Sequence, residues 1–136
     1  MLNLTSKTGT AQARQEIVFR YISDFRNFAN LLPSEKLQDT EITENSIRFR
    51  LSGLGEVGLT VAEQHPYHQL VIKAIEGTAA DFTFWINIEE MPSDTSKVNV
   101  LLHANLNMFI EMMAKSPLQQ FLDLMIDKVE EIKFEE

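Results

Sequence analysis

Between about Leu37 and Met108, apolar and polar residues alternate along the chain with a period of two. The alternating stretches are separated by the turn-forming segments ENS, GLG, HPYH, EGTA and MPSDTS. This pattern predicts six consecutive β-strands, each with one apolar face. Connections this short cannot cross over between parallel neighbours. We therefore expect an antiparallel meander with one covered face and one face toward water.

The residues before this region change from strand to helix periodicity. The segment LNLTSK alternates weakly and predicts a first strand that ends near Gly9. Over residues 12–24, apolar side chains recur every three or four positions, which predicts a helix with one apolar stripe. Asp24 is placed to cap a second short helix, FRNFANLL, which Pro33 ends because the residue before a proline avoids helical backbone angles.

The last part of the chain predicts a long amphipathic helix that covers the sheet. In SPLQQFLDLMIDKVEEIKF, apolar residues from Leu118 to Ile132 form one stripe, and Ser116 and Pro117 suit the N-cap and first helical positions. The preceding residues 109–114 are then expected to form a loose turn beside the mouth of the fold.

The segment SGLGEVGL contains Gly53, Gly55 and Gly58 in the G-x-G-x-x-G spacing of dinucleotide-binding loops. Such a loop must lead into a helix, whereas EVGLTVAEQ alternates as a strand. A hairpin is therefore predicted. Its register places Leu51 opposite Val57, Phe49 opposite Leu59 and Ile47 opposite Val61, and a bulge would shift it by one. In this register Arg50 faces Gly58, and Arg48 faces Thr60.

Composition narrows the range of partners. The 136 residues are 44% hydrophobic and 24% charged, as expected for one globular domain over 1–136. The net charge is −8, and the 12 Lys and Arg residues are scattered, so nucleic acid is not an expected partner.

The N-terminus lacks a secretory-signal pattern, so we expect a cytoplasmic location. The last helix carries too many charges to span a membrane.

The order of elements and three segments resemble one superfamily. VFRYISDFRNFANLLP, GLGEVGL and AKSPLQQFLD are similar to segments of small bacterial members of the START-related, polyketide-cyclase-like superfamily known as SRPBCC. The resemblance implies an α+β helix-grip fold, in which a curved seven-stranded antiparallel sheet surrounds a long C-terminal helix and two short helices follow the first strand. It also implies an apolar cavity, which in relatives accepts lipids, sterols, polyketides or plant hormones. Its members include carriers, cyclases, hydroxylase subunits and chaperone activators.

No group of residues predicts a catalytic centre. The chain has no cysteine, so thiol nucleophiles and thiolate metal sites are excluded. His65, His68 and His103 are assigned to a turn and a solvent face, and neither a metal nor a cofactor is expected. Glu63 and Glu111 are the carboxylates nearest the covered side, and both are assigned to its solvated rim.

Two features of the open face leave interpretations open. Arg48 and Arg50 can hold an anion or simply be solvated strand charges. Trp85 and Leu101 are expected to face outward and to mark a contact patch, with a homodimer as one use of it.

The preferred function is non-catalytic binding of a small apolar or amphipathic molecule, such as a lipid, between the sheet and the last helix. The alternatives are a protein-interaction domain with a filled core and a cyclase- or hydrolase-like enzyme. The methionines near the last helix either contact an adaptable ligand or fill an irregular junction. The residues expected to line the site are Phe28, Leu31, Phe49, Leu59, Phe82, Phe84, Met108, Met112, Phe121 and Met125.

Overall fold

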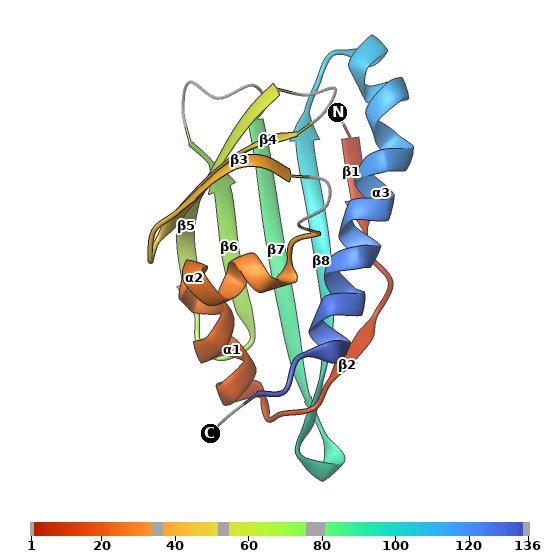
Figure 1. Ribbon diagram of the computed structural model, residues 1–136. Helices are drawn as coiled ribbons and strands as arrows, with labels where there is room; N and C mark the ends of the chain where they lie inside the picture. Colours follow the sequence, from red (N-terminus) through yellow and green to blue (C-terminus); the bar gives the residue numbers. More distant parts are fainter. Residues whose placement is uncertain (1, 34–36, 52–54, 76–80, 135–136) are drawn as a thin grey trace.

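The computed structural model describes residues 2–33, 37–51, 55–75 and 81–134. These residues form an α+β fold, in which a bent antiparallel sheet packs against a long C-terminal helix and two short helices (Figure 1). The strands are β1 Leu2–Thr5, β2 Gly9–Ala11, β3 Leu37–Ile42, β4 Ser46–Leu51, β5 Gly55–His65, β6 Gln69–Ala74, β7 Asp81–Met91 and β8 Thr95–Asn105. The helices are α1 Gln15–Ser23, α2 Phe25–Phe28, η1 Ala29–Leu31, η3 Pro92–Asp94 and α3 Met108–Glu131.

The sheet order β1-β8-β7-β6-β5-β4-β3 confirms the predicted meander of six strands. The predicted first strand ends at Thr5, earlier than expected, and a second short strand, β2, follows it. Both β1 and β2 pair with β8 at the same edge of the sheet. Ser6 lies between them and keeps the edge attached to β8. Its backbone N–H donates to the Val100 carbonyl, and its hydroxyl accepts from the Val100 N–H, both at 2.8 Å. The sheet therefore has seven strand positions built from eight strands.

The two short helices form where the sequence predicts them. Val18, Phe19 and Ile22 provide the buried face of α1. Asp24 caps α2 by accepting from the backbone N–H of Arg26 at 3.0 Å. The pKa of Asp24 is lowered, first by its side-chain hydrogen bond with Arg26 and then by this backbone bond.

The β4–β5 hairpin is present, but the predicted register is wrong by two residues. Ile47 pairs with Leu59, Phe49 with Val57 and Leu51 with Gly55. The arginine pairings change in the same way, since Arg48 faces Gly58 and Arg50 faces Glu56. Gly55 has a φ of 88°, a backbone conformation that favours glycine, and it ends the turn earlier than expected. Gly53 lies outside the described residues.

The predicted junction between the last strand and the last helix is also wrong. β8 ends at Asn105, and α3 begins at Met108 and runs without interruption to Glu131. Asn107 is the N-cap, because its side chain accepts from the N–H of Ile110 at 2.9 Å. Ser116 and Pro117 therefore lie inside the helix, and the expected loose turn at 109–114 is helical.

The core lies between the inner face of the sheet and the helices. α3 contributes one buried stripe, formed by Ala114, Leu118, Phe121, Leu122, Met125, Ile126 and Val129. Each long strand contributes alternate residues, as Phe82, Phe84, Ile86 and Ile88 do from β7. No helix among the described residues is long and apolar enough to cross a membrane.

Candidate functional site

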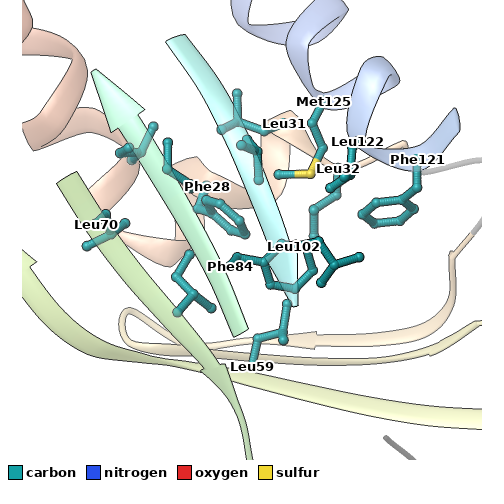
Figure 2. Packing of buried hydrophobic residues seen from close by; sticks show 14 of the residues in the cluster. Phe28, Leu31, Leu32, Leu59, Leu70, Phe84, Leu102, Phe121, Leu122 and Met125 are labelled. Atoms are coloured by element: carbon teal, nitrogen blue, oxygen red, sulfur yellow. The ribbon is translucent and has the colours of Figure 1, made fainter. Parts of the chain in front are cut away.

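Eight of the ten residues predicted to line a ligand site belong to one buried cluster, and each is at most 6% exposed. They come from α2, η1, three strands and α3, so they are brought together only by the fold. Figure 2 shows six of them converging between the sheet and the helices. The eight are Phe28, Leu31, Phe49, Leu59, Phe82, Phe84, Phe121 and Met125.

Met108 and Met112 lie apart from this cluster. They are 80% and 77% exposed, in the first turns of α3. The sequence placed Met108 on the inner face of a strand, whereas the helix that begins there turns it outward. The structure thus assigns the two methionines to the surface of the protein.

Several cluster residues were not among the predicted lining residues. Leu122 belongs to the predicted stripe of the last helix, and Leu102 belongs to the predicted inner face of its strand. Leu70 and Ile72 alternate in the short strand β6, a signal that was too brief to assign a face by itself. Figure 2 places Leu70, Leu102 and Leu122 around the predicted residues, together with Leu32.

The described interior is almost wholly apolar. Ser6 and Ser96 are the only buried polar or charged residues among those described. Both hydroxyls are used by the backbone, since Ser96 donates to the Ala13 carbonyl at 2.7 Å and Ser6 donates to the Lys7 carbonyl at 2.8 Å. Glu63 is exposed and Glu111 is half-buried, in keeping with rim positions. The described interior is therefore apolar and contains no buried acid or base.

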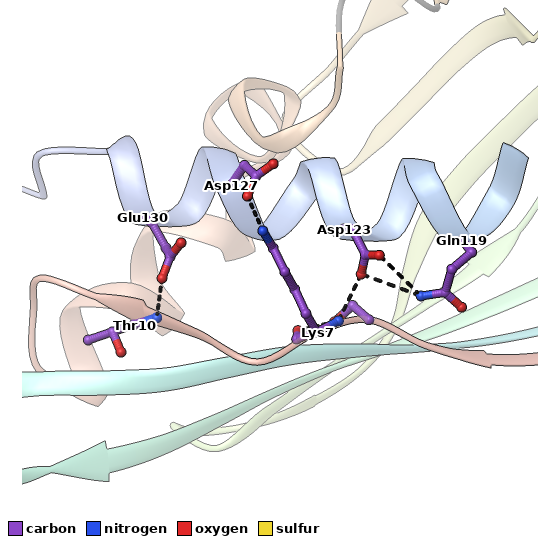
Figure 3. A network of polar contacts seen from close by, with 7 residues as sticks. Lys7, Thr10, Gln119, Asp123, Asp127 and Glu130 are labelled. Atoms are coloured by element: carbon purple, nitrogen blue, oxygen red, sulfur yellow. Dashed lines mark hydrogen bonds and ion pairs between the residues drawn. The ribbon is translucent and has the colours of Figure 1, made fainter. Parts of the chain in front are cut away.

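A polar seam fastens α3, which covers this interior, to the N-terminal edge of the sheet (Figure 3). Asp123 accepts from the backbone N–H of Lys7 at 2.8 Å, and Glu130 accepts from the backbone N–H of Thr10 at 3.1 Å. The Lys7 ammonium pairs with Asp127. The hydrogen bond to Asp127 is the main reason that the pKa of Lys7 is raised. In the seam, carboxylates of α3 thus accept hydrogen bonds from backbone N–H groups at the edge of the sheet.

Gly9 lies in this seam at a close approach of strand and helix. A Cβ atom at this position would fall well inside van der Waals contact with Cγ2 of Ile126, which is itself fully buried. We expect Gly9→Ala to lower the free energy of unfolding by about 1–3 kcal/mol through overpacking. Urea denaturation measures the change.

The matched control for this prediction is the double variant Gly9→Ala/Ile126→Ala. Because Ile126→Ala removes the clashing methyl group, the two substitutions should cost less together than the sum of their separate effects. Additive effects would contradict the close approach.

A shallow groove lies at the other edge of the sheet, over β3, β4 and β5. Its volume is about 150 Å³, below the range of roughly 300–1,000 Å³ for small-molecule pockets. Arg48 pairs with Glu56 at 3.1 Å, and Arg50 lies 3.8 Å from Asp39. Because carboxylates already accompany both arginines, the arrangement does not favour the anion site considered from the sequence.

The histidines and the outer patch are distributed over the surface. His65 lies 3.4 Å from Glu63, and its ring centroid is 6.1 Å from that of His68. In the part of the chain that the structure describes, no three His, Cys, Asp or Glu side chains are grouped to hold a metal ion. Trp85 pairs with Leu101 across two strands, outside the core cluster.

Comparisons of folds identify the architecture. The structure of protein XoxI from Bacillus cereus is similar with a TM-score of 0.72 at 12% identity, covering 96% of this chain and 94% of that one. A START superfamily protein from Mycobacterium smegmatis has a TM-score of 0.66 at 15% identity, covering 96% and 99%. The protein has a START-like helix-grip fold.

Norcoclaurine synthase from Thalictrum flavum shares this START-like fold, with a TM-score of 0.69 at 12% identity and coverage of 94% and 84%. By sequence, no family model and no curated protein matches the chain. The similarity therefore concerns the fold, and the function has to be argued from the residues.

Proposed function

We propose that the protein binds and carries a small apolar or amphipathic molecule, of the lipid class, between the sheet and α3, without converting it chemically. The observation that carries this proposal is the composition of the described interior, where all buried side chains except Ser6 and Ser96 are apolar or glycine or proline. Binding such a molecule requires apolar lining and shape, whereas acid-base catalysis requires ionisable groups beside the substrate. A cytoplasmic location in a bacterial cell is part of the same proposal.

The fold supports the proposal in a second way. α3 covers the inner face of the sheet, and the seam attaches it along the β1–β2 edge through Lys7 and Thr10. The opposite edge strand, β3, pairs only with β4 among the residues that the structure describes. A ligand would therefore enter on the side of β3 and β4, where Phe49 is the predicted lining residue nearest the edge.

Native mass spectrometry of the gently purified protein tests the proposal. We expect a small apolar mass to remain bound and to be released by organic solvent. Leu31 is 1% exposed within the cluster, so Leu31→Phe places extra volume where the ligand would lie. This variant should lower the occupied fraction by roughly tenfold, the effect of losing about 1.4 kcal/mol of binding energy.

Leu101→Phe is the matched control, because Leu101 lies on the outer face of β8 and outside the cluster. It should leave the occupied fraction unchanged, and circular dichroism should show that both variants are folded. A bound polypeptide in place of a small mass would favour the protein-interaction alternative. A ligand that leaves with a changed mass would favour the enzyme. Equal occupancy in both variants would contradict a site at the cluster.

A further inference from the structure

The first turns of α3 present a cluster of exposed apolar side chains, here called the α3 apolar cap. Its members are Met108, Phe109, Ile110, Met112 and Met113, which are 80%, 73%, 37%, 77% and 67% exposed. Five of the eight exposed large hydrophobic residues in the described chain thus lie within six consecutive positions. In Figure 1 this end of the helix rises beyond the end of β8.

The geometry of the helix separates this cap from the core. At roughly 100° per residue, four of the side chains lie on the half of the helix that faces away from Ala114 and Leu118, whereas Ile110 lies nearer the core side and is the least exposed of the five. Ala114 and Leu118 are buried and belong to the core stripe. From Lys115 onward the outer half becomes polar, with Ser116 and Gln120 exposed. The cap is therefore a local surface, distinct from the stripe that packs on the sheet.

The exposed apolar area of the cap is larger than expected for a surface that contacts only water. Taking about 200 Å² for a fully exposed large side chain, the five residues present roughly 650 Å². A typical monomer exposes apolar patches of at most about 300–600 Å², and a specific interface buries about 800 Å² on each partner. The cap thus supplies most of the apolar area that one side of a stable dimer needs.

The charge of the protein favours a second copy over a membrane. A net charge of −8 opposes contact with an anionic lipid surface. Between two copies, the acidic residues of the seam begin at Asp123, ten positions beyond Met113. That separation is about 15 Å along a helix, longer than the screening length of about 8 Å at physiological salt. Two caps can therefore meet without bringing the acidic seams together.

Among the described residues, the only other apolar surface of comparable size is the same cap on a second copy of the chain. The other exposed large hydrophobic residues, Ile42, Tyr67 and Leu101, lie singly on three separate parts of the fold. A two-fold axis brings the same patch of both subunits together, so a cap that needs an apolar partner finds one on a copy of itself. We propose that the α3 apolar cap is the contact through which two copies of this chain form a symmetric dimer.

Sedimentation equilibrium of the full chain over about 1–100 μM, a range around a micromolar dissociation constant, tests the dimer. Met112→Glu puts one charge from each subunit into the contact, and we expect it to weaken the dimer at least 100-fold. Leu101→Glu is the control, since Leu101 lies on the outer sheet face beside Trp85. It should leave the dissociation constant unchanged. A monomeric wild-type protein over the whole range, or a dimer that only Leu101→Glu dissociates, would overturn the proposal.

A crosslinking experiment locates the contact between the two subunits independently of the sedimentation measurements. Because the chain has no cysteine, Met113→Cys introduces a single thiol at the cap. We expect oxidation to link two Met113→Cys chains and to leave Lys128→Cys, near the other end of α3, unlinked. Crosslinking of Lys128→Cys alone would refute a contact at the cap. Wild-type protein that binds vesicles of zwitterionic phosphatidylcholine while remaining monomeric would assign the cap to a lipid surface and would also refute the dimer.

Discussion

Replacing Phe28 by alanine should lower the free energy of unfolding by about 3–5 kcal/mol. Phe28 is 1% exposed and stacks on Phe25 with ring centroids 4.9 Å apart. Its ring points from α2 into the cluster of Figure 2, where Phe84 and Leu31 also lie. The substitution removes a whole ring from among side chains that are themselves buried, so lost burial and an unfilled space both contribute. Urea denaturation followed by circular dichroism measures the loss.

Phe109→Ala provides the matched control for Phe28→Ala. The same ring is removed there, but Phe109 is 73% exposed, so we expect a change within about 0.5 kcal/mol. The control is measured at submicromolar protein concentration, because any dimer would add a concentration-dependent contribution. Equal losses for the two variants would mean that Phe28 does not belong to the packed core.

The burial of Phe28 could be predicted from the sequence, because helix periodicity and strand alternation match the observed structure in most of the chain. The Asp24 cap and Pro33 predicted a short helix between them, and Phe28 is buried in it. Alternation likewise placed Phe82 and Phe84 on one face of their strand, and both are buried there. The element order and the burial of eight of the ten predicted lining residues needed only these local patterns, because burial follows from them when one layer covers one face.

The register of the β4–β5 hairpin could not be predicted from such local patterns. A shift of two residues in the β4–β5 hairpin leaves every side chain on its own face, so the apolar pattern is equally satisfied before and after it. In the observed register Gly55 pairs with Leu51, and its backbone has a positive φ. Because Gly53 and Gly55 can both serve a turn, the amino-acid pattern contained no information that distinguished them.

The end of β8 and the start of α3 were predicted at the wrong residues because two local signals were misleading. Alternation continues from Val98 through Leu106 to Met108, although the paired part of β8 ends at Asn105 opposite Asp81. A strand needs a neighbour to satisfy its backbone, and the alternating pattern does not record where the neighbour ends. Met108 was therefore assigned to the inner face of a strand, and Met112 to a turn beside the cavity.

The second misleading signal was Ser116-Pro117, and it leads to the other large effect that we expect. Pro117→Ala should raise the free energy of unfolding by up to about 3 kcal/mol. Proline at this position cannot donate a backbone hydrogen bond to the Met113 carbonyl, and its ring crowds that turn. Pro117 is exposed, so alanine there removes no buried contact. The gain is measured by urea or thermal denaturation.

Ser116→Ala is the control for Pro117→Ala, because it changes the neighbouring exposed position and leaves the helix backbone intact. If α3 begins at Met108, Ser116→Ala should change stability by no more than about 0.5 kcal/mol. If the helix instead began at Pro117, Ser116 would be its N-cap. Ser116→Ala would then cost about 1 kcal/mol, and Pro117→Ala would give no gain. The two variants together therefore decide where the helix begins, and with it whether the α3 apolar cap exists as a helical surface.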